Sequence, residues 1–158
     1  MKSKLLVAGA IAVTFVAAAC GGTTSPTAIS SPSPSAASAG TTIAVANDAK
    51  LGQILIDSAG MTVYLFVADT GSVSTCYTSC AQIWPPVATS GAPQAGTGAT
   101  ASLLGTSKRT DGKTQVTYAG HPLYYFVNDK KAGDTTGQGV NGFGGLWWVL
   151  SPSGAAIH

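Results

Sequence analysis

Two cysteines four positions apart, Cys76 and Cys80, are the side chains best suited to chemistry in this chain. A disulfide between them is expected, because the N-terminal segment indicates export to a compartment that can be oxidising. In a regular helical turn, residues four apart have Cβ atoms about 5 to 6 Å apart, whereas a disulfide prefers roughly 3.5 to 4.5 Å. A bonded pair therefore predicts a distorted turn or loop before Trp84.

Redox exchange and metal binding are the alternatives for Cys76 and Cys80. Thioredoxin-type motifs and most zinc knuckles have two residues between their cysteines, and attached haem requires Cys-x-x-Cys-His. A structural zinc site needs four protein ligands, and only His121 and His158 could complete one here. The spacing favours a structural disulfide over either alternative, and no metal site is predicted.

Apart from the cysteine pair, no group of residues in the sequence indicates a catalytic site. His121 lies in a Gly-His-Pro segment, where a histidine on a surface turn is expected, and the chain has no nucleophile elbow, paired glutamates or phosphate-binding loop. Asp129 and Asp134 could help to hold calcium, but their spacing does not match an EF-hand loop. Turn capping is the preferred role for these acids. We therefore expect a protein that is not an enzyme and uses no cofactor.

The first twenty residues have the layout of an export signal. Lys2 and Lys4 precede an uncharged run over 5–18, which is shorter than the roughly 20 apolar residues that a membrane-spanning helix needs. The sequence Val-Ala-Ala-Ala-Cys-Gly at 16–21 resembles a bacterial lipobox. This resemblance implies cleavage after residue 19 and a diacylglycerol thioether on Cys20, whose two chains satisfy the requirement for stable anchoring.

The segment 20–42 then follows as a lipidated cysteine and a tether rich in Ser, Thr, Pro, Ala and Gly. Such a composition cannot bury a core, so we expect a disordered linker with an r.m.s. span of about 25 Å. Removal of 1–19 takes Lys2 and Lys4 away from 8 basic residues, which leaves 6 against 6 acidic residues, all of them aspartates. A chain without net charge or a basic cluster excludes nucleic acid as a favoured partner.

Residues 43–158 suit one all-β domain. Short apolar runs are separated by Gly, Asn, Asp and Pro, and no long helical period is present. The dipeptide Asp111-Gly112 predicts a tight hairpin, and 57–60 predicts another turn. The expected strands are 53–57, 62–67, 102–106, 114–118, 122–127 and 146–150.

The domain contains an internal duplication. Residues 59–69 align without gaps on 119–129, with six of eleven positions identical, and the repeats are placed at about 51–88 and 112–151. Successive residues of a strand point to opposite faces, and in both copies the residues on each face are apolar. This pattern is typical of a central strand that is covered on two sides. We expect two pseudo-symmetric halves of short antiparallel strands, packed as a sandwich or a closed barrel.

The duplicated motif Tyr-x-aromatic-x-x-Asp is accompanied by Cys-x-x-x-Cys-Ala-x-x-Trp-Pro-Pro at 76–86 and Gly-Asp-x-x-Gly-Gln-Gly at 133–139. Together these motifs resemble a bacterial secreted-repeat lipoprotein family of unknown function, over nearly the whole folded domain. The resemblance implies no chemistry for the motif positions. They are Tyr64, Phe66, Asp69, Cys76, Cys80, Trp84, Pro85, Pro86, Tyr124, Phe126, Asp129, Asp134, Gly137, Gln138, Gly139 and Trp147.

The tryptophans offer a further binding hypothesis. Trp147 and Trp148 are adjacent on one expected strand and must point to opposite faces. Exposed aromatic rings near Tyr77 and Trp84 could form a patch for a glycan, a peptide or an envelope protein, although both faces being covered is the simpler expectation. We predict a monomeric, non-enzymatic binding or structural module, lipid-anchored to the cell membrane on its extracytoplasmic side. The alternative is an extracellular redox or metal-binding protein that uses its cysteine pair.

Overall fold

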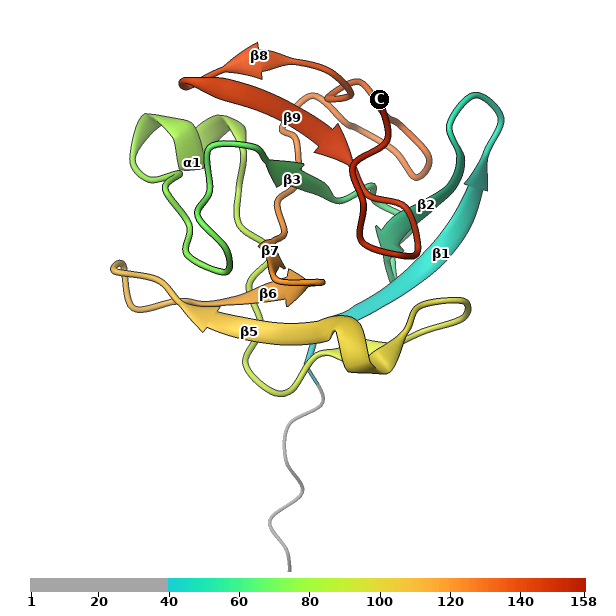
Figure 1. Ribbon diagram of the computed structural model, residues 1–158, viewed down its shortest axis with the longest axis horizontal. Helices are drawn as coiled ribbons and strands as arrows, with labels where there is room; N and C mark the ends of the chain where they lie inside the picture. Colours follow the sequence, from blue (N-terminus) through green and yellow to red (C-terminus); the bar gives the residue numbers. More distant parts are fainter. Residues whose placement is uncertain (1–39) are drawn as a thin grey trace, which may run out of the picture. The chain divides into compact units, whose positions relative to one another are not determined.

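The computed structural model of the chain describes residues 40–158. These residues form three small sheets, in the orders β2-β1-β4, β3-β9-β8 and β5-β6-β7, together with one α-helix and one 3-10 helix. Figure 1 shows the β8–β9 pair above β3, with the β5–β6 hairpin below it and the β1–β2 hairpin to its right. The elements are β1 (Thr42–Asp48), β2 (Gly52–Asp57), β3 (Tyr64–Phe66), α1 (Ser79–Ile83), β4 (Gln94–Ala95), η1 (Ala101–Leu103), β5 (Leu104–Lys108), β6 (Thr114–Tyr118), β7 (His121–Pro122), β8 (Asn141–Gly142) and β9 (Gly145–Val149).

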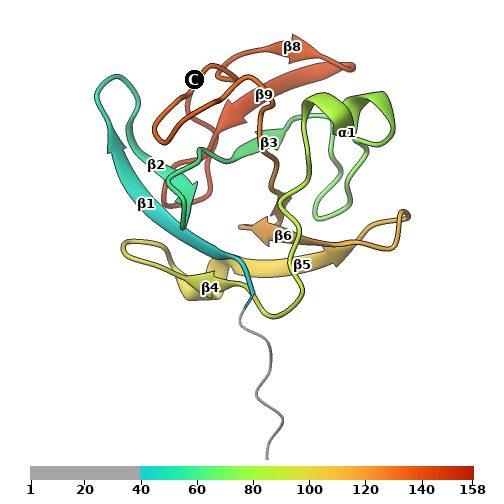
Figure 2. The same cartoon turned by 180° about the vertical axis from the view of Figure 1, so that it is seen from behind.

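The expected fold class is confirmed, with one correction. The described residues are mostly β structure, but the three sheets do not join into a closed barrel, so the barrel alternative is wrong. Nearly all strand pairs are antiparallel, and the exception is the short parallel pairing of β1 with β4, which Figure 2 shows from the reverse side. Among residues 40–158, no helix is long and apolar enough to cross a membrane.

The sequence did not predict the first strand of the first hairpin. β1 pairs with β2 in the register Ile43↔Asp57 to Asp48↔Gly52, although no strand was expected before residue 53. Its start at Thr42 also places the last residue of the expected tether within a sheet. The turn depends on Asp48, whose carboxylate accepts the backbone N–H groups of Lys50 and Leu51 at 2.8 Å.

The second hairpin lies where the sequence predicted it. β5 and β6 pair from Leu104↔Tyr118 to Lys108↔Thr114, and Gly112 occupies the turn with a φ of 84°. The hydrogen bond from Arg109 N–H to the carbonyl of Lys113, at 2.9 Å, closes the hairpin. The turn therefore contains the three residues 110–112 instead of the expected two. A three-residue loop with glycine in the left-handed region is the next most common hairpin connection.

Three other expected strands differ from the structure. The run 62–67 forms a strand only at 64–66, residues 101–103 are a 3-10 helix, and the run 122–127 pairs regularly only through β7. The run 122–127 does not form a longer strand, since Tyr124 makes only isolated bridges to Tyr64 and to Pro86. The central segments of the two repeats are therefore joined by one antiparallel bridge instead of a continuous ladder.

Both faces of the duplicated strands are covered, as the alternation predicted. Tyr64, Phe66, Tyr124 and Phe126 belong to one hydrophobic cluster. Val63, Leu65 and Leu123 belong to a second cluster on the other side. Burial ends before the last apolar position of each repeat, since Val67 and Val127 are exposed by 56% and 38%.

The hydrogen bonds of the two halves match. Tyr64 N–H donates to the Tyr124 carbonyl at 2.9 Å, and Tyr124 N–H donates back to the Tyr64 carbonyl at 2.9 Å. Val67 N–H bonds the carbonyl of Leu146 at 3.0 Å, and its counterpart Val127 bonds the carbonyl of Ile83 at 3.0 Å. A pseudo-two-fold axis therefore passes between the two central tyrosines.

Candidate functional site

Cys76 and Cys80 form a disulfide next to the aromatic core, with Cα atoms 5.2 Å apart. The expected distortion is present: Thr78, between the cysteines, has a φ of 48°, and α1 begins only at Ser79. Both cysteines are buried, at 0% and 6% exposure. Trp84 N–H donates to the carbonyl of Cys80 at 2.7 Å, so the bridged loop fixes the backbone of this tryptophan.

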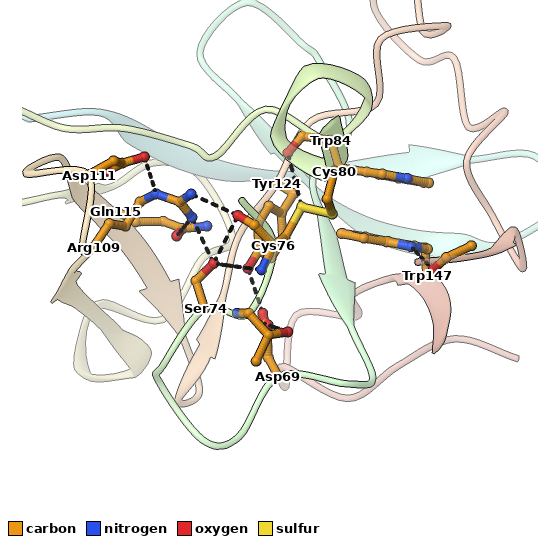
Figure 3. The surroundings of a disulfide bond; sticks show 12 residues. Asp69, Ser74, Cys76, Cys80, Trp84, Arg109, Asp111, Gln115, Tyr124 and Trp147 are labelled. Carbon is orange, nitrogen blue, oxygen red and sulfur yellow. Dashed lines mark hydrogen bonds and ion pairs between the residues drawn. A yellow bond between two sulfur atoms is a disulfide. The ribbon is translucent and has the colours of Figure 1, made fainter. Parts of the chain in front are cut away.

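A buried guanidinium holds the other side of the disulfide loop, as Figure 3 shows. Arg109 is 4% exposed and donates to the Cys76 carbonyl at 2.7 Å, to Ser74 Oγ at 2.7 Å and to Gln115 Oε1 at 2.9 Å. It also pairs with Asp111 at 3.1 Å. Sequence reasoning missed Arg109, because nothing in its position before a hairpin turn indicates burial.

The charge of Arg109 affects its acidic neighbour. Burial of the Asp111 carboxyl group raises its pKa, but the N–H of Lys113 and the Arg109 guanidinium outweigh that effect and hold the pKa below its usual value. Arg109 also lies over the Tyr77 ring, at 4.3 Å from its centroid. A hydrogen bond with Thr110, opposed by burial, helps to lower the pKa of Tyr77. The loop is thus fixed by hydrogen bonds, charge and a cation–π contact.

Four aromatic rings form a continuous stack across the pseudo-two-fold axis, here called the aromatic stack. Phe66 stacks on Trp147 at 4.0 Å, Trp147 on Trp84 at 4.0 Å, and Trp84 on Phe126 at 4.2 Å between ring centroids. Each end of the stack therefore joins the phenylalanine of one repeat to the tryptophan of the other. Trp84 is only 1% exposed, so its ring belongs to the core and adds no surface to an aromatic patch.

The tyrosines and aspartates of the duplicated motif pair reciprocally between repeats. Tyr64 donates its hydroxyl hydrogen to Asp129 at 2.6 Å, and Tyr124 donates to Asp69 at 2.6 Å. Asp69 also accepts the N–H and hydroxyl of Thr75, at 2.7 and 2.8 Å. The alignment of the two repeats made their tyrosines and aspartates equivalent. It did not predict that each tyrosine would bind the aspartate of the other copy.

These pairs lie in a region where ionisation of a phenol is costly. Burial, and then the hydrogen bond to Asp129, raises the pKa of Tyr64 well above its usual value. The pKa of Tyr124 is raised in the same way by burial and by Asp69. The two tyrosines consequently act as neutral hydrogen-bond donors. Such donors are unsuited to act as acids or bases near neutral pH.

One network connects the Tyr124–Asp69 pair to the disulfide loop. The hydroxyl of Tyr124 lies 2.7 Å from Ser74 Oγ, and Ser74 in turn accepts from Arg109. On the other side of the axis, Gly137 N–H donates to the hydroxyl of Tyr64 at 3.2 Å. A Cβ atom at Gly137 would approach ring atoms of Trp84 and Tyr64 at 2.8 and 2.9 Å, which gives this motif glycine a packing reason.

The remaining acids confirm the turn-capping prediction. Asp57 accepts the N–H groups of Ala59 and Met61 at 2.8 and 2.9 Å, and Asp134 accepts those of Lys130 and Lys131 at 2.9 and 3.2 Å. Within the described part of the chain, no three His, Cys, Asp or Glu side chains are placed to hold a metal ion.

The structure thus brings the six aromatic motif residues into one core beside the disulfide, with Asp69 and Asp129 bonded to its two tyrosines. Trp147 is fully buried and Trp148 is partly exposed on the other face of β9, as their adjacency required. His121 lies in β7 and is partly buried. The expected lipidation site, Cys20, lies outside the described residues.

Comparisons with known proteins give one match. No curated protein and no solved structure matches the chain. The family model described as a secreted repeat of unknown function matches twice, over residues 45–88 and 105–151. Each copy starts about one strand earlier than expected, because β1 and β5 are the first strands of the two repeats. The chain therefore belongs to the family of secreted repeats of unknown function, and it contains two copies of the repeat.

Proposed function

We propose that this protein is a lipid-anchored protein of the cell envelope, whose duplicated domain is a non-enzymatic binding or structural module on the extracytoplasmic side. The family's description as secreted supports export. The lipobox-like segment before Cys20 supports attachment through diacylglycerol. A domain on such an anchor stays near the membrane, while its tether sets its reach.

The reciprocal pairing of tyrosine and aspartate is the observation on which the non-enzymatic role rests. A catalytic site needs a nucleophile or base that reaches substrate in an accessible cleft. Here the polar groups of the duplicated motif bond one another across the axis, and Tyr64 and Tyr124 are fully buried. Their arrangement supports a role in locking the repeats together and presenting a rigid surface.

Use of Cys76 and Cys80 in redox exchange or metal binding is the less supported alternative. A reactive cysteine is typically a partly exposed thiolate, whereas these sulfur atoms bond each other inside the core. Mass measurement of the native protein after treatment with a mild thiol reductant and an alkylating reagent distinguishes the two. We expect no added label before unfolding and two labels after it. Ready labelling of native protein, or stoichiometric zinc or copper, would favour the alternative.

Metabolic labelling with an alkyne-bearing fatty acid tests the anchor. The wild type and the double variant Cys76→Ser/Cys80→Ser should both carry the label and remain with the membrane fraction. The Cys20→Ser variant should lose the label. Label that persists in Cys20→Ser, or that disappears in the double variant alone, contradicts the proposal.

A further inference from the structure

A second feature of the domain adjoins one end of the aromatic stack, at Phe66. A pocket of about 300 Å³ opens between β3, β7, β9 and the segment 156–158. Its volume is at the lower end of the range of small-molecule sites, which are mainly apolar with a few placed polar groups. Its lining residues are Leu65, Phe66, Val67, Asp69, His121, Trp148, Ala156 and His158.

Comparison of the two repeats explains why the pocket is open. Leu65 lines it, and the residue at the equivalent position of the second repeat is Tyr125. The longer Tyr125 side chain reaches Asp57, with a hydrogen bond of 2.9 Å. Burial, followed by the charge of Asp57, raises the pKa of this phenol above its usual value. The first repeat has no such ring, so the shorter Leu65 leaves space beside Trp148.

The second repeat also supplies the chemical groups of the pocket. His121 and Trp148 stand where the first repeat has Met61 and Pro85. The indole of Trp148 meets the ring of His158 edge to face, with centroids 4.7 Å apart. Neither His121 nor His158 has a side-chain hydrogen bond to any other residue in 40–158. Two imidazoles thus remain available beside one aromatic face.

The charges of the pocket restrict the ligand. No lysine or arginine lines it, which disfavours an anion. Asp69 is the one acid among the lining residues, and both of its oxygens are already bonded, one to Thr75 and the other to Tyr124. The groups left for recognition are apolar surfaces, one indole and two imidazoles.

We propose that this pocket binds a small uncharged ring compound of the phenol or indole class, whose ring packs against Trp148 and Leu65 and whose polar group bonds His121 or His158. This inference deepens the binding role proposed above and rests on it. The volume suits one or two fused rings, and the imidazoles supply both a donor and an acceptor. A sugar with many hydroxyl groups would leave most of them unpaired in so apolar a pocket.

Saturation-transfer NMR on the full-length chain in lipid nanodiscs, with empty nanodiscs as the blank, tests the proposal with indole and phenol as probes. We expect saturation transfer to both probes, and shifts of the His121 and His158 imidazole signals when indole is added. Glucose and benzoate, added separately, should give neither effect. Absence of transfer to either probe, or stronger effects from glucose, benzoate or zinc, would overturn the proposal.

A substitution taken from the other repeat provides the matched variant. Leu65→Tyr places in the pocket the side chain found at its equivalent position, so transfer to indole should be lost. Tyr125→Phe, on the opposite half, should bind indole as the wild type does. Equal binding by folded Leu65→Tyr overturns the proposal; if that variant does not fold, the imidazole shifts of the wild-type pocket decide.

The two proposals fail separately. Fatty-acid labelling that depends on Cys20, together with no binding of indole or phenol, overturns the pocket inference and leaves the anchored module. Binding of indole that Leu65→Tyr abolishes, together with labelling independent of Cys20, keeps the pocket and overturns the anchor.

Discussion

Removal of one hydroxyl group, in Tyr64→Phe, tests whether the reciprocal pairs hold the repeats together. This hydroxyl donates to Asp129 at 2.6 Å and accepts the N–H of Gly137 at 3.2 Å, and Tyr64 is fully buried. A hydrogen bond to a charged group contributes about 1.5 to 3 kcal/mol, and a buried polar group left without a partner costs about 1 to 3 kcal/mol. We therefore expect the free energy of unfolding to fall by about 3 kcal/mol.

Tyr118→Phe is the matched control. Tyr118 is also fully buried, but its hydroxyl bonds neutral backbone groups, donating to the Pro152 carbonyl at 2.8 Å and accepting from Thr100 N–H at 3.0 Å. Loss of neutral hydrogen bonds costs about 1 kcal/mol each, so this variant should lose less stability. Urea unfolding followed by circular dichroism, with the disulfide intact, measures both.

If Tyr64→Phe destabilises the protein no more than Tyr118→Phe does, the tyrosine–aspartate pair is not a special contribution to the interface between repeats. A double variant with Tyr124→Phe extends the test, because the two hydroxyl groups lie on opposite sides of one shared backbone bridge. Independent pairs would give additive losses, and coupled pairs would not.

Three further outcomes follow from the same contacts. Burial raises the folded-state pKa of Tyr64 and Tyr124 above 10, so the folded state binds more protons than the unfolded state above pH 10. The free energy of unfolding should therefore fall as the pH rises beyond that value, and it should fall less steeply in Tyr64→Phe. Unfolding measured as a function of pH tests this. Gly137→Ala should cost about 1 to 3 kcal/mol in urea unfolding, since its Cβ would meet Trp84 and Tyr64, whereas Gly142→Ala, with open space around it, should cost less than about 1 kcal/mol; equal losses would contradict the packing argument. Arg109→Lys should destabilise the protein by about 2 kcal/mol or more, because an ammonium group cannot reproduce a planar fork bonded to several acceptors; unchanged thermal unfolding would count against it.

Local sequence patterns predicted the parts of the fold that depend on neighbouring residues. The β6 strand was predicted at its observed bounds, and the turns at 57–60 and at Gly112 were placed correctly. Alternation within the duplicated strands predicted two covered faces. The strand β1 was missed because its beginning has the composition of the preceding linker, and the helix α1 because five residues are too few to show a helical period.

The sequence by itself determined that the domain is duplicated and mostly β, that its acids cap turns, and that its two close cysteines could bond only across a distorted loop. These features depend on residue type and on separations of a few positions along the chain. Only the tertiary structure decided that Tyr64 binds Asp129 and Tyr124 binds Asp69, over separations of 65 and 55 residues. It alone also buried Arg109 and opened the pocket over Leu65. The physical reason is that hydrogen bonds and packing across a pseudo-two-fold axis depend on how the repeats meet, and two copies of one motif could equally have been satisfied within themselves.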